Sequence, residues 1–283
     1  MHRVRVSALV CSIAALVCGS ALAQPVTPVR DPAGLRRLQS ASGGTARVGV
    51  SPATAGARFV RVPAGRALGQ GAAPTLSGKQ DQSRRFFRAY AALLGVSPEG
   101  MRFMKSHTDR LGETHLTWGQ YHGAVPVFGA IVKTHFDRAH QLKGYSGTAI
   151  PDVTVNPTPT IALQRAAGVA LAAVTAEHLT AAAPPRIGRT ALYVFRSGLA
   201  KGVPGENHLV WEVEISNGAE VRELVYVDAH TGKIVDRISG IQDELSRRAY
   251  DGHNLPARPR TTRTARSGWK GSASRRPPSK RTT

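Results

Sequence analysis

The residues best suited to chemistry in this chain are its 10 histidines. A zinc metallopeptidase needs His-Glu-x-x-His on one helix, so that both imidazoles face a single ion and the Glu activates its water. That run does not occur in the sequence, and the closest downstream pair, His135 and His140, falls in a region of strand and turn. Two ligands on one strand need positions i and i+2, which this pair does not have. The sequence therefore predicts no metal site, and each histidine is expected to be structural or at the surface.

Other catalytic patterns are also absent from the sequence. It contains no Gly-x-Ser-x-Gly turn to expose a nucleophilic serine and no Gly-x-x-x-x-Gly-Lys-Ser/Thr loop to hold a phosphate. Its cysteines, Cys11 and Cys18, both lie in the apolar N-terminal segment. We therefore expect no catalytic residue and no cofactor in this chain, and we predict that it is not an enzyme.

The N-terminus has the pattern of a secretory signal peptide. Arg3 and Arg5 precede an apolar run over residues 8–17, and Ala21-Leu22-Ala23 forms a small-x-small site before Gln24. The apolar run is too short to span a bilayer. We predict cleavage between Ala23 and Gln24, which removes residues 1–23, and a secreted or periplasmic (cell-envelope) protein without a transmembrane anchor. The mature chain would then contain no cysteine and no disulfide.

The formal charge of +20 is distributed unevenly along the chain. Residues 254–283 contain nine Lys and Arg residues and no acid, and their single aromatic residue is Trp269. Counterion release could bind such a tail to nucleic acid or to an anionic membrane. The aromatic residues that interleave with the charges of a single-strand binder are missing, however. We expect residues 253–283 to be a basic, disordered tail with no specific nucleic-acid partner.

Composition and periodicity divide the rest of the chain. Residues 24–77 are rich in Ala, Gly, Pro and Arg, and we expect a loosely ordered lead with one short strand at 58–62. A first unit covers residues 78–150. Large apolar residues recur at spacings of three and four over residues 80–94, which predicts a helix that ends at Gly95. The strands predicted after it cover residues 101–106, 114–137 and 141–150.

A Pro-containing linker at residues 151–159 precedes a second unit, residues 160–252. Thr160 is predicted to cap a helix that runs to about Leu179, and residues 181–189 are predicted to be a loop. The strands predicted after it cover residues 190–195, 209–215, 221–227 and 234–238. A helix followed by antiparallel strands in each unit predicts an α+β fold of two small lobes.

The segment from Gly112 to Ala130 carries the most specific motif in the chain. Leu116 and Trp118 alternate there with smaller or polar residues, which predicts a strand buried on one face. The segment resembles the signature of the fungalysin/thermolysin propeptide, in which Gly-x-x-His is followed by Gln, then by Gly, and then by Pro-Val-Phe-Gly. The seven residues that carry the resemblance are His115, Gln120, Gly123, Pro126, Val127, Phe128 and Gly129. We expect Trp118 and Phe128 to be buried anchors of the first sheet, and Gly123 and Gly129 to serve backbone geometry.

The second unit resembles a PepSY module, which commonly forms the second half of these propeptides. The resemblance rests on the strand Trp211-Glu212-Val213 and on a turn that contains Asp228, Thr231, Gly232 and Lys233. The segment 248–252 resembles the last strand of the family before the junction with the enzyme. The two resemblances cover about residues 78–252 and imply a cystatin-like prodomain in which each lobe packs a helix on an antiparallel sheet, between disordered termini.

These resemblances imply the pro-region of a secreted thermolysin-like zinc metallopeptidase. Such a zymogen segment inhibits the peptidase domain and assists its folding, in cis or in trans. Zinc and calcium are then expected only in that peptidase domain, which the sequence given lacks. Two alternatives stay open: a stand-alone secreted protein that binds or inhibits a peptidase in trans, and a cationic envelope-binding protein that acts through its tail.

The tail itself has two interpretations. Codons for residues 265–271, regrouped one base earlier, permit Pro-Phe-Trp-Val-Glu-Gly, which resembles the Trp-x-Glu-Gly junction that follows the prodomain in some family members. We therefore hypothesise that residues 253–283 are an out-of-frame translation in a truncated or frameshifted precursor. A genuine cationic tail is the alternative, and DNA sequence beyond the stop codon distinguishes the two.

Overall fold

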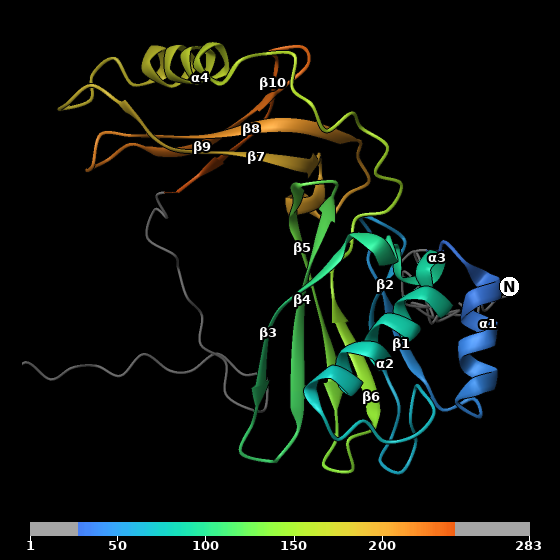
Figure 1. Ribbon diagram of the computed structural model, residues 1–283. Helices are drawn as coiled ribbons and strands as arrows, with labels where there is room; N and C mark the ends of the chain where they lie inside the picture. Colours follow the sequence, from blue (N-terminus) through green and yellow to red (C-terminus); the bar gives the residue numbers. More distant parts are fainter. Residues whose placement is uncertain (1–27, 241–283) are drawn as a thin grey trace, which may run out of the picture. The chain divides into compact units, whose positions relative to one another are not determined.

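The computed structural model describes residues 28–240, which form an α+β fold with mostly antiparallel strands (Figure 1). The first lobe contains most of the elements, with a short 3-10 turn at Pro98–Gly100 between its helices and its longer strands. In chain order these elements are α1 (Pro32–Ala41), β1 (Arg47–Val50), β2 (Ala57–Arg61), α2 (Leu76–Ala89), α3 (Ala91–Leu94), β3 (Met101–Thr108), β4 (Thr114–His122), β5 (Val125–Phe136) and β6 (Leu142–Gly147).

The strands of the first lobe form one antiparallel sheet in the order β1-β2-β6-β5-β4-β3. Helix α2 begins where the Thr75 side chain accepts a hydrogen bond from the Gly78 N–H, and it buries Phe86 and Phe87. The ring of Phe87 meets the fully buried Trp118 of β4 edge-on, with 5.4 Å between the ring centroids. One face of the sheet is therefore the core of the lobe, and α2 covers it.

The expectation of a loosely ordered segment is wrong for residues 28–77, because they also form α1, β1 and the start of α2. The one short strand predicted there, 58–62, is confirmed as β2. The side chain of Asp31 caps α1 by accepting from the Gly34 N–H, and Leu38 of this helix is buried in the main core. Strand β2 pairs with β6 through Val60 and Tyr145. The composition of this segment is poor in local signals, and its order comes from pairing with a strand about 85 residues away in the sequence.

The helix predicted over residues 80–94 is divided. Helix α2 ends at Ala89, Tyr90 leaves helical geometry with ψ of 24°, and the short α3 follows. Gly95 ends α3 in the left-handed region with φ of +73°, as its position after Leu94 predicts.

The second lobe packs one long helix on four antiparallel strands in the order β7-β8-β9-β10. Its core joins the small residues Ala166 and Ala170 of the helix to Val213 and Val225 of the sheet. A short 3-10 turn at Leu199–Lys201 follows the first of these strands. The elements are α4 (Leu163–Glu177), β7 (Arg186–Arg196), β8 (Asn207–Ser216), β9 (Arg222–Asp228) and β10 (Ile234–Ser239).

Two predictions about the second lobe need correction. Thr160 does not cap α4: the N-cap is Ala162, which makes no side-chain cap hydrogen bond, and the Thr160 hydroxyl donates instead to the His230 carbonyl at 3.1 Å. Strand β7 begins at Arg186, inside the predicted loop 181–189, because Arg186 and Ile187 pair with the end of β8.

The sheets of the two lobes are joined through β5. Near its start, Val127 pairs in parallel with Val194 of β7, whereas the rest of β5 pairs with β4 and β6. Val127, Val194 and Leu209 share a buried cluster with Ile150 at the start of the linker. The prediction of separate antiparallel sheets is thus corrected to a mixed sheet with one parallel bridge.

No helix among residues 28–240 is long and apolar enough to cross a membrane. The predicted signal peptide, the strand expected at residues 248–252 and the basic tail lie outside the described residues.

Candidate functional site

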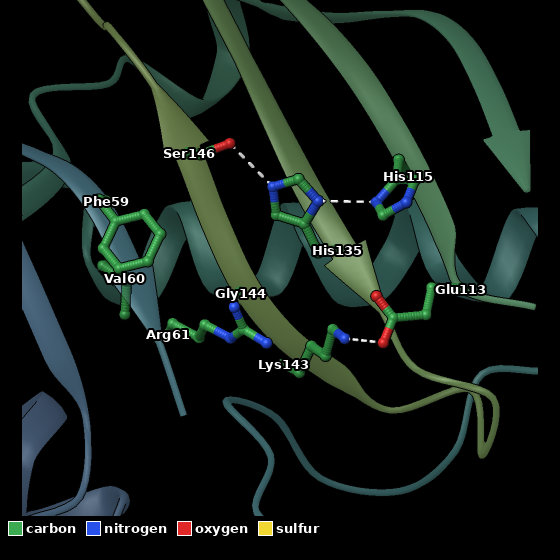
Figure 2. A pocket seen from close by; sticks show the side chains of 9 residues that line it. All are labelled: Phe59, Val60, Arg61, Glu113, His115, His135, Lys143, Gly144 and Ser146. Atoms are coloured by element: carbon green, nitrogen blue, oxygen red, sulfur yellow. Dashed lines mark hydrogen bonds and ion pairs between the residues drawn. The ribbon is translucent and has the colours of Figure 1, made fainter. Parts of the chain in front are cut away.

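An open cavity of about 330 Å³ lies on the face of the first sheet that α2 does not cover (Figure 2). Side chains along a strand alternate between its two faces. Thr134 and Tyr145 turn toward α2, where Thr134 bonds to Ser83, so their neighbours His135 and Ser146 turn toward the cavity. The lining residues are Phe59, Val60, Arg61, Glu113, His115, His135, Lys143, Gly144 and Ser146.

The strand register places three histidines in one row on this face. His107 of β3 is the direct partner of His115 of β4, and His115 is the direct partner of His135 of β5. Directly opposed residues of antiparallel strands point to the same face, with Cβ atoms about 5 Å apart. We call His107, His115 and His135 the histidine row. Cross-strand pairing creates it, so the spacing of these residues along the chain gave no sign of it.

The two inner histidines belong to a chain of hydrogen bonds across three strands (Figure 2). His135 Nε2 lies 2.8 Å from Ser146 Oγ, and His135 Nδ1 lies 2.8 Å from His115 Nδ1. His115 Nε2 lies 3.3 Å from the carboxylate Oδ2 of Asp109. A carboxylate only accepts, so His115 Nε2 carries a proton. In the neutral tautomer of His115, its Nδ1 accepts from His135 Nδ1, and Ser146 donates to His135 Nε2.

The environment of His135 disfavours its charged form. Burial lowers the pKa of His135 to about 4, and the nearby His115, Lys133 and Lys143 act in the same direction against a weaker opposing effect of Glu113. His135 is therefore a neutral hydrogen-bonding group near pH 7.

The order Ser146, His135, His115, Asp109 is like that of a nucleophile, its base and an orienting carboxylate, but it does not support catalysis. A base whose pKa is about 4 has little tendency to take a proton from a serine hydroxyl near neutral pH. Ser146 also pairs with Lys133 on one side and Phe59 on the other. The neighbouring backbone N–H groups are therefore used by the sheet and are not free to stabilise an oxyanion.

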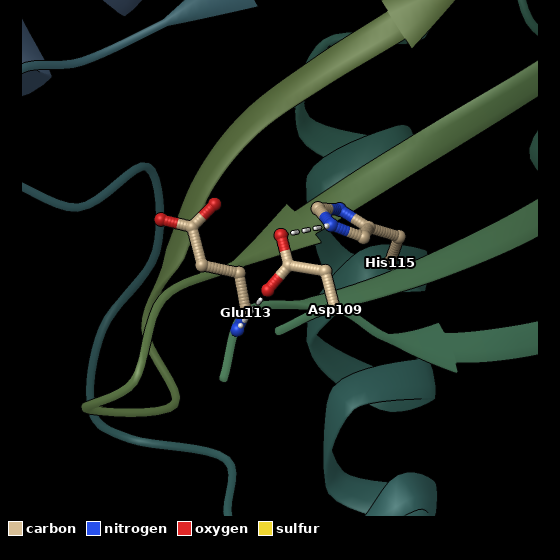
Figure 3. A group of neighbouring side chains, drawn as sticks. All are labelled: Asp109, Glu113 and His115. Carbon is tan, nitrogen blue, oxygen red and sulfur yellow. Dashed lines mark hydrogen bonds and ion pairs between the residues drawn. The ribbon is translucent and has the colours of Figure 1, made fainter. Parts of the chain in front are cut away.

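Asp109 and Glu113 close the turn between β3 and β4 beside this chain (Figure 3). Asp109 Oδ1 accepts from the N–H groups of Leu111 and Glu113, each at 2.9 Å. The Glu113 N–H holds the pKa of the Asp109 carboxyl below its usual value, and His115 and the Leu111 N–H add to this shift against the effect of burial. The Glu113 carboxylate forms an ion pair with Lys143 of β6. Asp109, Glu113 and His115 offer ligand atoms within 4.8 Å of one another, yet each is already bonded, Glu113 to Lys143 and Asp109 to His115.

The other residues of the first signature lie away from the cavity. Gln120 is buried, and its amide donates to the Ile150 carbonyl at 2.7 Å and accepts from the Ile150 N–H at 2.9 Å. Gly123 takes φ of +59° in the two-residue turn between β4 and β5, a conformation that favours glycine. Pro126 follows this turn and pairs with Tyr121. These residues shape the hairpin and hold the start of the linker.

Phe128 does not anchor the first sheet, contrary to expectation. It is partly buried and packs against three aromatic rings of the second lobe, Tyr193, Phe195 and Tyr226, with ring centroids between 5.3 and 5.7 Å apart. The next residue, Gly129, has φ of +69°, and this turn in β5 lies beside the parallel bridge that joins the sheets at Val127. The signature segment Val127-Phe128-Gly129 therefore connects the lobes.

The turn of the second motif is built around Asp228. Its Oδ1 accepts from the N–H groups of His230 at 2.9 Å and Thr231 at 2.7 Å, and its Oδ2 lies 3.1 Å from His208 Nδ1. Burial would raise the pKa of the Asp228 carboxyl, but these hydrogen bonds outweigh it and hold the pKa below its usual value. Gly232 has φ of +73°, and the Lys233 carbonyl accepts from the Asp228 N–H to close the turn. This is a structural turn.

Both motifs hold the linker that separates them. His122, beside the first turn, lies 2.9 Å from the Val155 carbonyl through Nε2. His230, in the second turn, lies 3.0 Å from the Asn156 carbonyl through the same atom. The two motifs therefore contact adjacent residues of the linker, Val155 and Asn156.

Comparison with protein-family models agrees with this arrangement. The model described as Fungalysin/Thermolysin Propeptide Motif matches residues 99–149, and that described as Peptidase propeptide and YPEB domain (PepSY) matches residues 161–238. The chain carries a propeptide motif followed by a PepSY domain. Both matches are to propeptide-type domains and neither is to a catalytic domain, which is consistent with a non-catalytic chain.

Comparison with individual proteins adds less. Among solved structures the chain is similar to the Bacillus megaterium YpeB C-terminal domain, with 12% identity over 66% of this chain and 73% of that chain and a TM-score of 0.30. No curated protein matches the sequence.

Of the residues around the cavity, His115 was predictable from its place in the signature. No local pattern indicated the residues that surround it, Asp109, Glu113, His135 and Ser146. The alternation in β4 and β5 indicated which residues share a face, but nothing local in the sequence fixes the register between the strands.

Proposed function

We propose that this chain is the prodomain of a secreted thermolysin-like metalloendopeptidase, which it inhibits and helps to fold. The observation that carries the proposal is the order of a fungalysin/thermolysin propeptide motif and a PepSY domain on one chain. The absence of a usable active site among the described residues supports it, since a protein of this role acts by binding.

The way the lobes are joined supports a single binding unit. The parallel bridge at Val127, the aromatic contacts of Phe128 and the histidine bonds to the linker all connect the two motifs. A preorganised surface binds with less loss of conformational entropy than two lobes on a free tether. Such a unit would prefer the native-like peptidase over its unfolded chain, and it would thereby stabilise the folded enzyme by mass action while it blocks the cleft.

Inhibition is the direct test. The chain from Gln24 onward should slow peptide hydrolysis by a cognate thermolysin-like peptidase at micromolar concentration, and it should hydrolyse no peptide itself. A serine peptidase of unrelated fold serves as the control and should be unaffected. Failure to slow any thermolysin-like peptidase of the source organism would overturn the proposal, as would a chelator-sensitive peptidase activity in this chain.

Folding assistance is tested separately. A denatured cognate peptidase, diluted into buffer with its zinc and calcium, should recover more activity when the chain is present than when an equal mass of albumin is present. The ions that catalysis requires belong to that peptidase domain in this proposal. Equal recovery with both additives would limit the role to inhibition.

Removal of the tail distinguishes the alternatives. In the proposed role, inhibition should survive deletion of residues 254–283, because the propeptide-type domains end before them. A cationic envelope-binding protein would instead lose its binding to polyanions and to vesicles that contain anionic lipid. The secreted location we propose is checked by N-terminal sequencing of exported protein, which should begin at Gln24.

A further inference from the structure

We propose that the histidine row is a binding site for a divalent transition-metal ion, held between Nδ1 of His115 and Nδ1 of His135 on the open face of the first sheet. This activity is separate from the proposed role as a prodomain. It rests on four features of the cavity: the spacing of the two nitrogens, the partners of the outer ring atoms, further donors nearby, and access from solvent.

The spacing of the two nitrogens fits a shared ion. Two ligand atoms about 2.0 Å from a metal are roughly 2.8 Å apart when they subtend a right angle and roughly 3.3 Å apart at the tetrahedral angle. The Nδ1 atoms of His115 and His135 are 2.8 Å apart, and the rings are inclined at 69° to each other. The separation already suits adjacent positions of a Cu²⁺ or Ni²⁺ ion, whereas Zn²⁺ needs the nitrogens slightly further apart. In either case the two rings must rotate so that their Nδ1 lone pairs, now directed along the hydrogen bond, converge on the ion.

The outer nitrogen of each ring already has the kind of partner that orients a metal-binding histidine. Such a histidine donates its other N–H to a carboxylate or a polar oxygen. Asp109 Oδ2 takes this place for His115, and Ser146 Oγ takes it for His135.

Binding requires a change of tautomer as well as rotation of the rings. The Nδ1 proton of His135 moves to Nε2, and the Ser146 hydroxyl turns from donor to acceptor. With neutral His115, both Nδ1 lone pairs are then free for the ion, and no proton is gained or lost.

Further donors lie on the same face. His107, the cross-strand partner of His115, is exposed. Glu113 is close to His115. Its carboxylate is paired with Lys143 and would have to leave it (Figure 2). Water can fill any remaining position, because the cavity is open. Imidazole nitrogen with one carboxylate suits Cu²⁺, Ni²⁺ and Zn²⁺ and excludes Ca²⁺ and Mg²⁺, which require a shell of oxygen ligands.

Positively charged residues near the site limit the affinity expected for the ion. Lys133 and Lys143 lie near His135 and act against a cation, so we expect micromolar binding. Lys143→Gln removes one of these charges and releases Glu113, so it should increase the affinity for the ion several-fold.

The experiment titrates Cu²⁺ and Zn²⁺ separately into the chain from Gln24 onward, which contains all the described residues and lacks Cys11 and Cys18. Calorimetry should show one ion per chain, and Cu²⁺ electron paramagnetic resonance should show coupling to imidazole nitrogen. The melting temperature should rise with either ion and stay unchanged with Ca²⁺ or Mg²⁺. His115→Ala and His135→Ala should each weaken binding roughly tenfold or more.

Two further variants separate metal binding from loss of structure. Ser146→Ala keeps both ligands and should still weaken binding, by roughly tenfold, because it removes the partner that orients His135. His178→Ala is the matched control, since His178 also contacts a carboxylate, Glu223 at 3.1 Å, but lies in the second lobe and is hydrogen-bonded to no other histidine of residues 28–240. It should bind the ion as the parent chain does. Absence of binding at about 100 µM ion, or binding that persists in the His115→Ala/His135→Ala double variant, would overturn the proposal.

Discussion

The two lobes both pack a helix on an antiparallel sheet, but they use the other face of the sheet differently. In the first lobe the core lies on one side only, where α2 brings Phe86 and Phe87 against Trp118 and Tyr145. The opposite side is open and carries titratable groups, among them His115 and His135. In the second lobe both sides are apolar: α4 covers one, and the cluster of Phe195, Val210 and Tyr226 occupies the other.

This difference shows which part of the molecule is available for binding. A sheet face that carries a second core contributes to stability and cannot be exposed without cost. The first lobe draws its stability from large aromatic residues on one side, so the other side is free to hold titratable groups. The predictions below test that division.

The largest loss of stability should come from a substitution in the core of the first lobe, which lies on one side of its sheet. Trp118→Ala removes a fully buried ring that packs against Phe87 and Phe103 and donates to Thr134, and it should lower the free energy of unfolding by about 3–5 kcal/mol. Urea unfolding followed by circular dichroism measures it. Ile131→Ala, at a residue of the same sheet that is 48% exposed, is the control and should cost well under 1 kcal/mol. Equal costs for the two variants would contradict the proposed core.

Acid should destabilise the first lobe through His135, which lies on the open face of its sheet. The folded state holds the pKa of His135 at about 4, against 6.5 for the free side chain, so the unfolded chain takes up the proton first as the pH falls. The stability that neutral His135 allows is therefore complete above about pH 6.5 and is lost between pH 6.5 and 4. From pH 7 to pH 4.5 we expect a loss of about 2 kcal/mol from this group, reduced from the full linkage value because the ring is partly exposed.

The measurement is urea unfolding at the two pH values in the presence of a chelator. Other groups also titrate, so the informative quantity is the difference between the parent chain and His135→Gln, which should lose less stability on acidification. His178→Gln, in the second lobe, is the comparison and should follow the parent chain. If His135→Gln is as acid-sensitive as the parent, the role assigned to His135 is wrong.

Phe128 should show that a residue of the first motif stabilises the second lobe. Phe128→Ala removes a partly buried ring that contacts Tyr193, Phe195 and Tyr226, and we expect a cost of about 1–3 kcal/mol. Amide hydrogen exchange locates the effect: protection should fall in β7 and β9 more than in β4. A loss of protection confined to β3 and β4 would show that Phe128 stabilises the first sheet instead.

The smallest effect should come from an ion-pair network at the edge of the second lobe. Arg237 of β10 donates to Glu177 of α4 and to Glu223 of β9 at 2.6 Å. The bond to Glu177, and then that to Glu223, raise the pKa of Arg237 against the effect of burial. Arg237→Gln should destabilise by about 1 kcal/mol at low ionic strength and by less in high salt, because the groups are partly exposed. A cost that does not change with salt would indicate packing by the arginine stem.

Much of the fold was predictable from local pattern. Alternation of large residues marked the strands over 101–106 and 114–137, and a spacing of three and four marked the first long helix. The propeptide and PepSY resemblances also rest on residues close together in the sequence, and both are confirmed by the family models. Apart from the strand at 58–62, the N-terminal segment was mispredicted because its order depends on distant partners, above all on the pairing of β2 with β6.

The sequence by itself determined the kinds of element, the glycine turns at Gly123 and Gly232, and the lack of a known catalytic motif. Only the tertiary structure decided that Phe128 packs on the second lobe and that His107, His115 and His135 stand in one row. The physical reason is the distance along the sequence over which each effect acts. Dihedral preference and side-chain alternation act over a few residues, so they are written in the local sequence. Strand register is fixed by the fit of whole strands to a shared core, and it brings together nitrogens that the chain itself holds 20 residues apart.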